Sequence, residues 1–408
     1  MHCSSLSLVN FRNYVRLDLE LSPDVTVIIG NNAQGKSNLL EAIYYLATTK
    51  SFRANSDREL LNWLTSSDEV PFARLVAGIK RRHNAIRLEI VIHEEQRRDA
   101  GLNGSAPGPI GKRIKVNGVA KRAMDLVGLV NVVMFSPEDI ALIQGTPQVR
   151  RRYLDITISQ VDPRYCRTLS HYNKVLLQRN HLLRQIRDQH SRPDQLTFWD
   201  EEIVNAGAYI MLRRLETVGT LNELSRSVHH QLTDGNERLQ IGCLLNLDQV
   251  KGGVEISQMI SQEPSYTPQE RKLKRIAEAF SERLKAYQAK EILYGMSLIG
   301  PHRDDLTFKV DGRDMNLFGS RGQQRTIVLS LKLAETQFMR AQTEEEPILL
   351  LDDVLSELDP ARRAYVHDTV VGGRQVIITS SAPDSLSTDF LRRANVLRVE
   401  NGRISSVV

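Results

Sequence analysis

A glycine-rich stretch from Gly30 to Ser37 carries the strongest chemical signal in the sequence. It fits the pattern GxxxxGK[ST], in which backbone N–H groups and the start of a following helix surround phosphate oxygens. Lys36 is expected to reach the β- and γ-phosphates of a nucleotide, and the Ser37 hydroxyl to bind Mg²⁺. We therefore predict a site for ATP and Mg²⁺, with cofactor-binding residues Gly30, Asn31, Asn32, Ala33, Gln34, Gly35, Lys36, Ser37 and Asn38.

Two carboxylates follow an apolar run near the other end of the chain. Residues 348–351 are Ile-Leu-Leu-Leu, which is typical of a buried central strand, and Asp352 and Asp353 come directly after them. Ligands of open α/β sheets bind at the carboxyl ends of the strands, so Asp352 is the predicted second protein ligand of the metal, with Ser37. Asp353 is then placed to orient or activate water, and Asp353 and Lys36 are the predicted catalytic residues.

A second possible anion site is the segment from Gly319 to Arg325, which we call the signature segment. It precedes a helical pattern over 326–341, and Ser320 and Gly322 at the start of a helix favour binding of an anion. One phosphate loop already serves the γ-phosphate, so Ser320, Gly322 and Gln323 are expected to reach the nucleotide of a second subunit in a two-fold dimer. The alternative is that the segment only caps its helix.

The elements that must position these residues occur at both ends of the chain. Strands are expected over 25–29, 86–93 and 376–378, a helix over 37–49, and a hairpin turn at Asn117-Gly118. The middle differs, with long amphipathic patterns over 165–186, 199–228 and 269–293. The fold class is therefore α/β. We expect a discontinuous P-loop head of residues 1–138 and 295–408, with an inserted, mainly helical arm of residues 139–294.

Composition sets weaker limits. The cysteines are Cys3, Cys166 and Cys243, and no CxxC pair occurs, which argues against a zinc knuckle and fits a reducing compartment. The beginning of the chain has no secretion pattern and no apolar run is long enough to span a bilayer, so a cytoplasmic location is expected.

Charge is concentrated in one part of the chain. The whole chain carries a net charge of +5, whereas ten Lys/Arg and three Asp/Glu give +7 between Arg150 and Arg192. Such a block favours contact with nucleic-acid phosphates, and the predicted DNA-binding residues are Arg150, Arg151 and Arg152. The alternative is that these arginines pair with acidic residues and brace the protein. The cluster from His302 to Asp305 lacks metal-ligand spacing and is expected to form a structural turn.

The motifs, in this order, resemble the ABC ATPase superfamily, especially its DNA-repair branch with the SMC-type heads. Ser356–Asp359 follows the carboxylate strand at the spacing of the dimer-contacting loop in that superfamily. A narrower similarity to a family of bacterial recombination mediators spans nearly the whole chain. Its residues are in the segments 10–14, 145–155, 300–306 and 319–326.

The resemblance implies an ATP-driven homodimer that binds double-stranded DNA at single-strand gaps. It also implies a DNA-dependent ATPase with slow hydrolysis, and RecR, with RecO, as protein partners in loading the recombinase. It places Arg12 near the nucleotide phosphates, Ser320 at the γ-phosphate of the opposite subunit, and Asp359 among the cofactor-binding residues.

Two departures from the wider superfamily favour a slow switch over a pump. Asp353 replaces the usual Glu, and Thr379 or Ser380 stands near the position of the usual switch histidine. The alternatives are a nucleotide-binding subunit of a membrane transporter and an SMC-type clamp head. The large basic insertion argues against the first, and an arm too short for a long coiled coil argues against the second.

Overall fold

The computed structural model describes residues 1–62, 71–95, 108–248, 256–262, 264, 267–370, 373–381 and 388–406. The chain forms two compact units. The terminal unit combines Met1–Asp139 with Met339–Val408, and the middle unit is Ile140–Phe338. Within the described ranges, no helix combines the length and the apolar character needed to cross a membrane.

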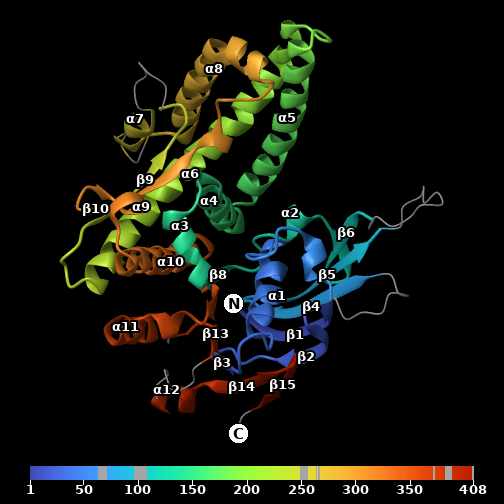
Figure 1. Cartoon of the computed structure of the whole chain (residues 1–408), viewed down its shortest axis with the longest axis vertical. Coiled ribbons are helices and arrows are strands. Elements are labelled where there is room, and N and C mark those ends of the chain that lie inside the picture. The colour runs from blue at the N-terminus through green and yellow to red at the C-terminus, as the bar shows by residue number, and fades with distance from the viewer. Residues whose placement is uncertain are drawn as a thin grey trace. The chain divides into compact units, whose positions relative to one another are not determined.

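A six-stranded, mainly parallel sheet forms the core of the terminal unit (Figure 1). Its strands, in spatial order, are β15 (Arg403–Ser406), β14 (Asn395–Glu400), β3 (Val25–Ile29), β13 (Val376–Ser380), β12 (Ile348–Asp352) and β8 (Val132–Phe135). Every residue of the last four strands is buried, as expected of parallel strands covered on both faces. The predicted strands over 25–29, 348–351 and 376–378 are confirmed.

A second, antiparallel sheet completes the terminal unit. Its strands, in spatial order, are β2 (Tyr14–Glu20), β1 (His2–Phe11), β4 (Phe72–Lys80), β5 (Ala85–Glu94), β6 (Ile110–Val116) and β7 (Val119–Lys121). The predicted turn between β6 and β7 is confirmed, because Asn117 and Gly118 both have positive φ, at 50° and 82°. Helix α1 (Lys36–Thr48) contacts strands of both sheets, and it is almost entirely buried.

Short helices complete the terminal unit and lie mostly in its connections. They are η1 (Asp57–Leu60), α2 (Ala123–Leu126), η2 (Pro137–Ile140), η5 (Val354–Glu357), α11 (Pro360–Val370) and α12 (Thr388–Arg393). Two of them, η2 and η5, begin within two residues of the ends of β8 and β12. The polar residues of these two connections therefore lie at the carboxyl edge of the parallel sheet.

The middle unit is mainly helical. Its long helices α5 (Pro163–Arg187), α6 (Leu196–Leu232) and α8 (Gln269–Tyr294) pack on one another, as Figure 1 shows. Arg179 of α5 is fully buried among them, where its guanidinium donates to Asp200, Glu291 and Ser297 at 2.7 Å each. The three long helices predicted from the amphipathic patterns are confirmed.

The remaining elements of the middle unit lie before α5, between α6 and α8, and after α8. They are α3 (Ala141–Gln144), α4 (Pro147–Val161), η3 (Pro193–Gln195), β9 (Leu239–Leu244), α7 (Ile256–Gln262), η4 (Pro301–Arg303), β10 (Asp305–Val310), β11 (Arg313–Asp314), α9 (Met315–Phe318) and α10 (Arg321–Thr343), the last of which ends in the terminal unit. The turn expected at His302–Asp305 is confirmed as η4. Buried Asp304 there accepts from Arg214 at 3.0 Å.

The compact units differ from the predicted division at one boundary. Residues 295–338, which we expected with the head, belong to the middle unit. The physical reason is the antiparallel pairing of β10 with β9 over six residues, from Asp305–Leu244 to Val310–Leu239. Strand pairing of this kind is not visible in the amphipathic pattern. A functional head made of residues 1–138 and 295–408 stays a prediction.

Candidate nucleotide-binding site

The predicted phosphate loop joins β3 to α1, as its sequence context requires. Gly30 has φ +155°, and a Cβ on it would lie 2.4 Å from the Val399 carbonyl oxygen. Gly35 has φ +115°, and a Cβ there would lie 2.6 Å from Asn13 Nδ2. Only glycine fits both positions without moving neighbouring atoms. The loop is therefore shaped by its two glycines, as the pattern requires.

Lys36 turns its side chain back over the loop. Its Nζ donates to the Gly30 carbonyl at 2.6 Å and to the Asn31 carbonyl at 2.9 Å. Burial lowers the pKa of the Lys36 ammonium, while the Asp353 and Asp352 carboxylates act in the opposite direction. The ammonium therefore lies over the phosphate loop, close enough to Asp352 and Asp353 to feel their charge, as the sequence predicted.

Two residues at the turn from β1 into β2 hydrogen-bond to the phosphate loop. Asn13 Nδ2 donates to the Gln34 carbonyl at 2.9 Å, and Tyr14 Oη donates to the Gly35 carbonyl at 3.0 Å. Asn38 Nδ2 donates to Asn13 Oδ1 at 2.8 Å, so the first turn of α1 joins the same network. Asn13 and Tyr14 belong to the segment 10–14 that carries the family resemblance. In the structure both side chains donate to backbone carbonyls of the phosphate loop.

Arg12, which the resemblance placed near the phosphates, is bound to a carboxylate. Its Nε and Nη2 donate to the two oxygens of Glu41 at 2.8 Å each, and its Nη1 donates to the Glu59 carbonyl at 2.8 Å. Glu41 lies on α1 with no exposed surface, and Ser51 also donates to it. Such a bidentate pair is strong and geometrically specific. Contact of Arg12 with a nucleotide stays a prediction.

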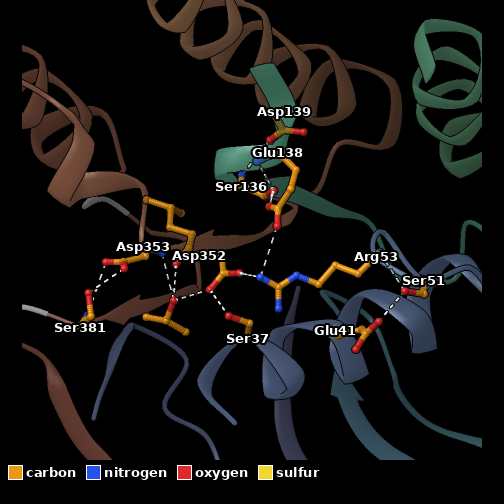
Figure 2. A network of polar contacts seen from close by, with 12 residues as sticks. Ser37, Glu41, Ser51, Arg53, Ser136, Glu138, Asp139, Asp352, Asp353 and Ser381 are labelled. Carbon is orange, nitrogen blue, oxygen red and sulfur yellow. Dashed lines mark hydrogen bonds and ion pairs between the residues drawn. The ribbon is translucent and has the colours of Figure 1, made fainter. Parts of the chain in front are cut away.

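Ser37 and Asp352 meet at the carboxyl edge of the parallel sheet (Figure 2). Ser37 Oγ donates to Asp352 Oδ1 at 2.7 Å, and Thr379 Oγ1 donates to the same oxygen at 2.7 Å. The other carboxylate oxygen, Oδ2, is buried and accepts no hydrogen bond from the described residues. Its ion-pair partner is Arg53, whose Nη2 lies 3.3 Å away. The metal ligands predicted from the sequence are therefore together.

Asp353 is held one residue further along, in the left-handed region at φ 52°. Ser381 Oγ donates to Asp353 Oδ2 at 2.7 Å, and the Asp353 N–H bonds to Thr379 Oγ1 at 3.1 Å. A non-glycine residue in this conformation costs free energy and persists when its surroundings hold it there. Thr379 and Ser380 were expected near the switch position, whereas the side chain that donates to the Asp353 carboxylate is that of Ser381.

Arg53 and Glu138 are two further residues of this network. In Figure 2 the guanidinium of Arg53 points between Asp352 and Glu138, and its Nη2 lies 3.4 Å from Glu138 Oε1. Glu138 follows β8 and accepts from Ser136, so it belongs to the carboxyl edge of a strand adjacent to β12. Arg53 was not among the residues predicted from the sequence. Its position after α1 is the one signal that could have found it.

The signature segment lies in the middle unit and begins α10. The Gln323 N–H donates to Ser320 Oγ at 3.2 Å, and the Ser320 N–H donates to Gln323 Oε1 at 3.1 Å. This reciprocal pair is a capping box, so the helix starts at Arg321 rather than at the expected 326. Ser320 and Gly322 are both exposed. The serine does cap its helix, and its O–H remains able to donate to an anion.

The remaining predicted site residue near the sheet edge, Asp359, also caps a helix. Its Oδ1 accepts from the Arg362 N–H at 2.9 Å, at the start of α11. Asp359 itself is exposed. Its predicted role in binding the cofactor is not decided by this contact.

The three consecutive arginines, Arg150 to Arg152, differ in burial and in their partners. Arg150 is 5% exposed, its Nε and Nη2 donate to Asp305 at 2.6 and 2.8 Å, and its Nη1 donates to the Gly145 carbonyl at 2.8 Å. Arg151 Nη1 donates to the Asp304 carbonyl at 2.7 Å, and Arg152 is exposed. For Arg150 the geometry favours the bracing alternative over contact with DNA, because a buried, bidentate guanidinium is not available to a phosphate.

Comparisons with known proteins agree with this geometry. The family model described as RecF/RecN/SMC N terminal domain matches residues 2–404. The DNA replication and repair protein RecF of Roseiflexus castenholzii is 43% identical, over 99% of both chains. That of Chloroflexus aurantiacus is 42% identical, again over 99% of both.

Solved structures show the same relationship. A structure of the recombination mediator protein RecF-ATP in the RecFOR pathway has a TM-score of 0.82 and 31% identity, covering 100% of this chain and 98% of that one. An SMC head bound to the C-terminal winged helix domain of ScpA, at TM-score 0.52 and 14% identity, shares the fold alone. The predicted fold class is therefore confirmed as that of an ABC-type ATPase, and the chain belongs to the RecF family of DNA replication and repair proteins.

Proposed function

We propose that this protein is an ATP-dependent DNA-binding protein of recombinational repair and replication-fork maintenance. It binds ATP with Mg²⁺, closes into a homodimer, engages double-stranded DNA at single-strand gaps and helps load the recombinase. A membrane-transporter subunit is not supported by the family. The observation that carries the proposal is the meeting of Ser37 and Asp352 below the phosphate loop, with Asp353 beside them.

The residues of this edge fit a magnesium-bound triphosphate. Ser37 and Asp352 offer a hydroxyl and a carboxylate, which are the hard oxygen ligands Mg²⁺ takes when phosphates complete its coordination. The buried Asp352 Oδ2 accepts no hydrogen bond from the described residues, so it can bind the metal ion in addition to its ion pair with Arg53. When bound, the metal ion neutralises charge on the β- and γ-phosphates. Backbone N–H groups of the loop and Lys36 hold the same phosphates.

Hydrolysis is slow because the residue that orients water is an aspartate, where a glutamate is usual. Asp353 has one methylene fewer than glutamate, and Ser381 fixes one of its carboxylate oxygens at 2.7 Å. At the expected switch position, Thr379 donates to Asp352. No imidazole takes part in these contacts. ATP therefore acts as a timed switch between the dimer and the separate subunits.

Dimerisation uses the signature segment. Ser320 and Gly322 are exposed at the start of α10, where backbone N–H groups and the helix dipole favour an anion. Each copy already has one phosphate loop, so we assign the Ser320 hydroxyl, Gly322 and Gln323 to the γ-phosphate of the opposite copy. Two nucleotides are then enclosed between two subunits.

DNA binding is assigned to the outer face of α5. This helix contains six Lys/Arg and no Asp/Glu over its 25 residues. Exposed basic side chains recur at intervals of three, four, three and seven, so they form one stripe, which we call the α5 stripe: Arg164, Arg167, His171, Lys174 and His181. At 1.5 Å per residue the stripe is about 26 Å long, long enough to follow several successive phosphates. Arg151 and Arg152 stay secondary candidates, and Arg150 is withdrawn.

Protein partners follow from the relatives. The solved RecF structure with ATP belongs to the RecFOR pathway, which supports RecR, with RecO, as partners of this chain. The partner-binding surface is not assigned to particular residues.

Binding to gapped duplex at a series of salt concentrations tests the DNA assignment. Replacing Arg164, Arg167 and Lys174 by alanine should reduce the salt slope by about 0.9 per lost phosphate contact, or about 2.7 for three. The matched control replaces Arg271, Lys274 and Lys285, which are exposed on α8 among acidic residues, and should leave the slope unchanged. An unchanged salt slope in the α5 variant would show that the α5 stripe does not bind DNA.

A further inference from the structure

Two consecutive apolar side chains beside the signature segment are unusually exposed. Leu317 is 75% exposed and Phe318 is 72% exposed, the two highest values among the large hydrophobic side chains that the structure describes as exposed. Isolated exposed hydrophobic residues are ordinary on protein surfaces, but two bulky neighbours of this kind are typical of an interaction site. Leu317 and Phe318 therefore form a small apolar surface that their own chain does not cover.

The backbone fixes their outward direction. They end the short helix α9, whose first residue, Met315, is 3% exposed and turns inward. Asp314 accepts from the Asn316 N–H at 2.8 Å, and the Met315 carbonyl accepts from Gln324 Nε2 at 2.9 Å. Gln324 is itself held by Gln144 Nε2 at 2.6 Å. The exposed pair is therefore presented by a segment tied at both ends, and not by a loose loop.

The position of the pair restricts what can cover it. Phe318 precedes Ser320 by two residues, so their Cα atoms are at most about 7.6 Å apart. A Ser320 hydroxyl that reaches a phosphate held by another molecule must bring Leu317 and Phe318 to the surface of that molecule. We propose that Leu317 and Phe318 form the apolar anchor of the ATP-dependent dimer, packing on the nucleotide-binding face of a second copy of this chain. This inference rests on the proposed function.

The surrounding surface is suited to that occupant. Arg321 and Gly322 are exposed directly after Ser320, so the apolar pair is bordered by a cation and by backbone N–H groups. A triphosphate bound by the opposite copy supplies the complementary negative charge. An apolar anchor next to polar, charge-matched contacts is the usual arrangement of a binding hot spot.

Sedimentation velocity with ATP and Mg²⁺ tests the anchor. The double variant Leu317→Ser/Phe318→Ser should raise the dimer dissociation constant about tenfold or more, as loss of a hot-spot side chain does. Binding of a fluorescent ATP analogue to the monomer should stay unchanged, because neither side chain supports the core. The matched control is Leu177→Ser/Phe198→Ser, whose side chains on α5 and α6 are 68% and 60% exposed, and it should dimerise like the wild type.

The outcomes separate this inference from the function it rests on. A wild type that stays monomeric with ATP would overturn the proposed dimer itself. A wild type that dimerises together with an unimpaired double variant would overturn the anchor alone. Normal dimerisation combined with weakened DNA binding in the double variant would also overturn it, because DNA would then be the occupant of this face.

Discussion

Ser37 Oγ and Asp352 Oδ1 lie 2.7 Å apart, although 315 residues separate them in the chain. The two side chains come from opposite ends of the sequence and meet because β3 and β12 both flank β13 in one parallel sheet. Strands with the same direction place their carboxyl ends on one edge, so the loop after β3 and the turn after β12 are neighbours. The nucleotide site is a consequence of that strand order.

Replacing Lys36 tests the phosphate loop. Lys36→Met removes the ammonium that donates to the Gly30 and Asn31 carbonyls and that we assign to the β- and γ-phosphates of the nucleotide. ATP affinity should fall about 100-fold or more, measured by titration with a fluorescent ATP analogue. Lys80→Met, at an exposed position at the end of β4, is the control and should bind like the wild type. Unaltered ATP binding by Lys36→Met would contradict the assignment.

Replacing Asp353 tests whether this residue acts in ATP hydrolysis rather than in ATP binding. Asp353→Asn should keep ATP affinity but lower kcat by about 10²-fold or more, because an amide cannot accept the proton of the attacking water. Ser381→Ala removes the hydrogen bond to Asp353 and should lower kcat by less, with an unchanged affinity. Steady-state hydrolysis and analogue titration measure both effects. Equal turnover in Asp353→Asn and the wild type would exclude Asp353 from catalysis.

The environment of Arg150 predicts a stability effect. Arg150→Ala leaves Asp305 partly buried without its guanidinium partner, and breaking a buried pair in this way costs about 3–5 kcal/mol. Urea unfolding should show that loss, whereas the salt slope of DNA binding, measured where the variant is folded, should not change. Arg152→Ala, at an exposed position of the same helix, should cost less than about 0.5 kcal/mol. A reduced salt slope at full stability in Arg150→Ala would restore the DNA assignment.

His302 should make stability depend on pH. Its Nε2 lies 3.1 Å from the Ser297 carbonyl, which can only accept, so Nε2 carries the proton and Nδ1 accepts from Tyr172 Oη at 2.6 Å. Burial lowers the pKa of His302 from 6.5 to about 4. Between pH 6.5 and about pH 4, His302 is therefore protonated in the unfolded chain and neutral in the folded chain. Stability present above pH 6.5 should be lost as the pH falls toward 4, by up to about 3 kcal/mol.

A variant isolates that contribution. His302→Gln keeps a side chain that can donate and accept but does not titrate. Between pH 7 and pH 4 the unfolding free energy of the wild type should fall by up to about 3 kcal/mol more than that of the variant. Parallel curves across this window would show that His302 does not retain its neutral form in the folded protein.

Local sequence patterns predicted the residues of the site more completely than they predicted the boundaries of the two compact units. The phosphate loop and the Asp352–Asp353 pair depend on residues adjacent in sequence, and each lies in the structural context that was expected, whereas the signature helix begins five residues before its expected start. Thr379 was placed near the switch position, and it does contact Asp352. These are properties of strand ends and helix starts, which short sequence motifs specify.

Contacts between distant residues could not be derived in the same way. Arg53 reaches Asp352 although the two residues are far apart in the chain, and Ser381 reaches Asp353 only because β12 and β13 pair in one particular register. Arg150 illustrates the opposite error: its charge was visible in the sequence, but its carboxylate partner is 155 residues away. The β9–β10 pairing that moves residues 295–338 into the middle unit is likewise a long-range contact.

The central claim is that two copies of this chain enclose ATP between the phosphate loop of one and the signature segment of the other. Sedimentation velocity of the wild type and of Ser320→Arg, each with and without saturating ATP and Mg²⁺, tests it most directly. The account predicts a dimer only for the wild type with ATP, while Ser320→Arg binds ATP and stays monomeric. A wild type that remains monomeric under these conditions, or a Ser320→Arg variant that dimerises normally, would contradict it.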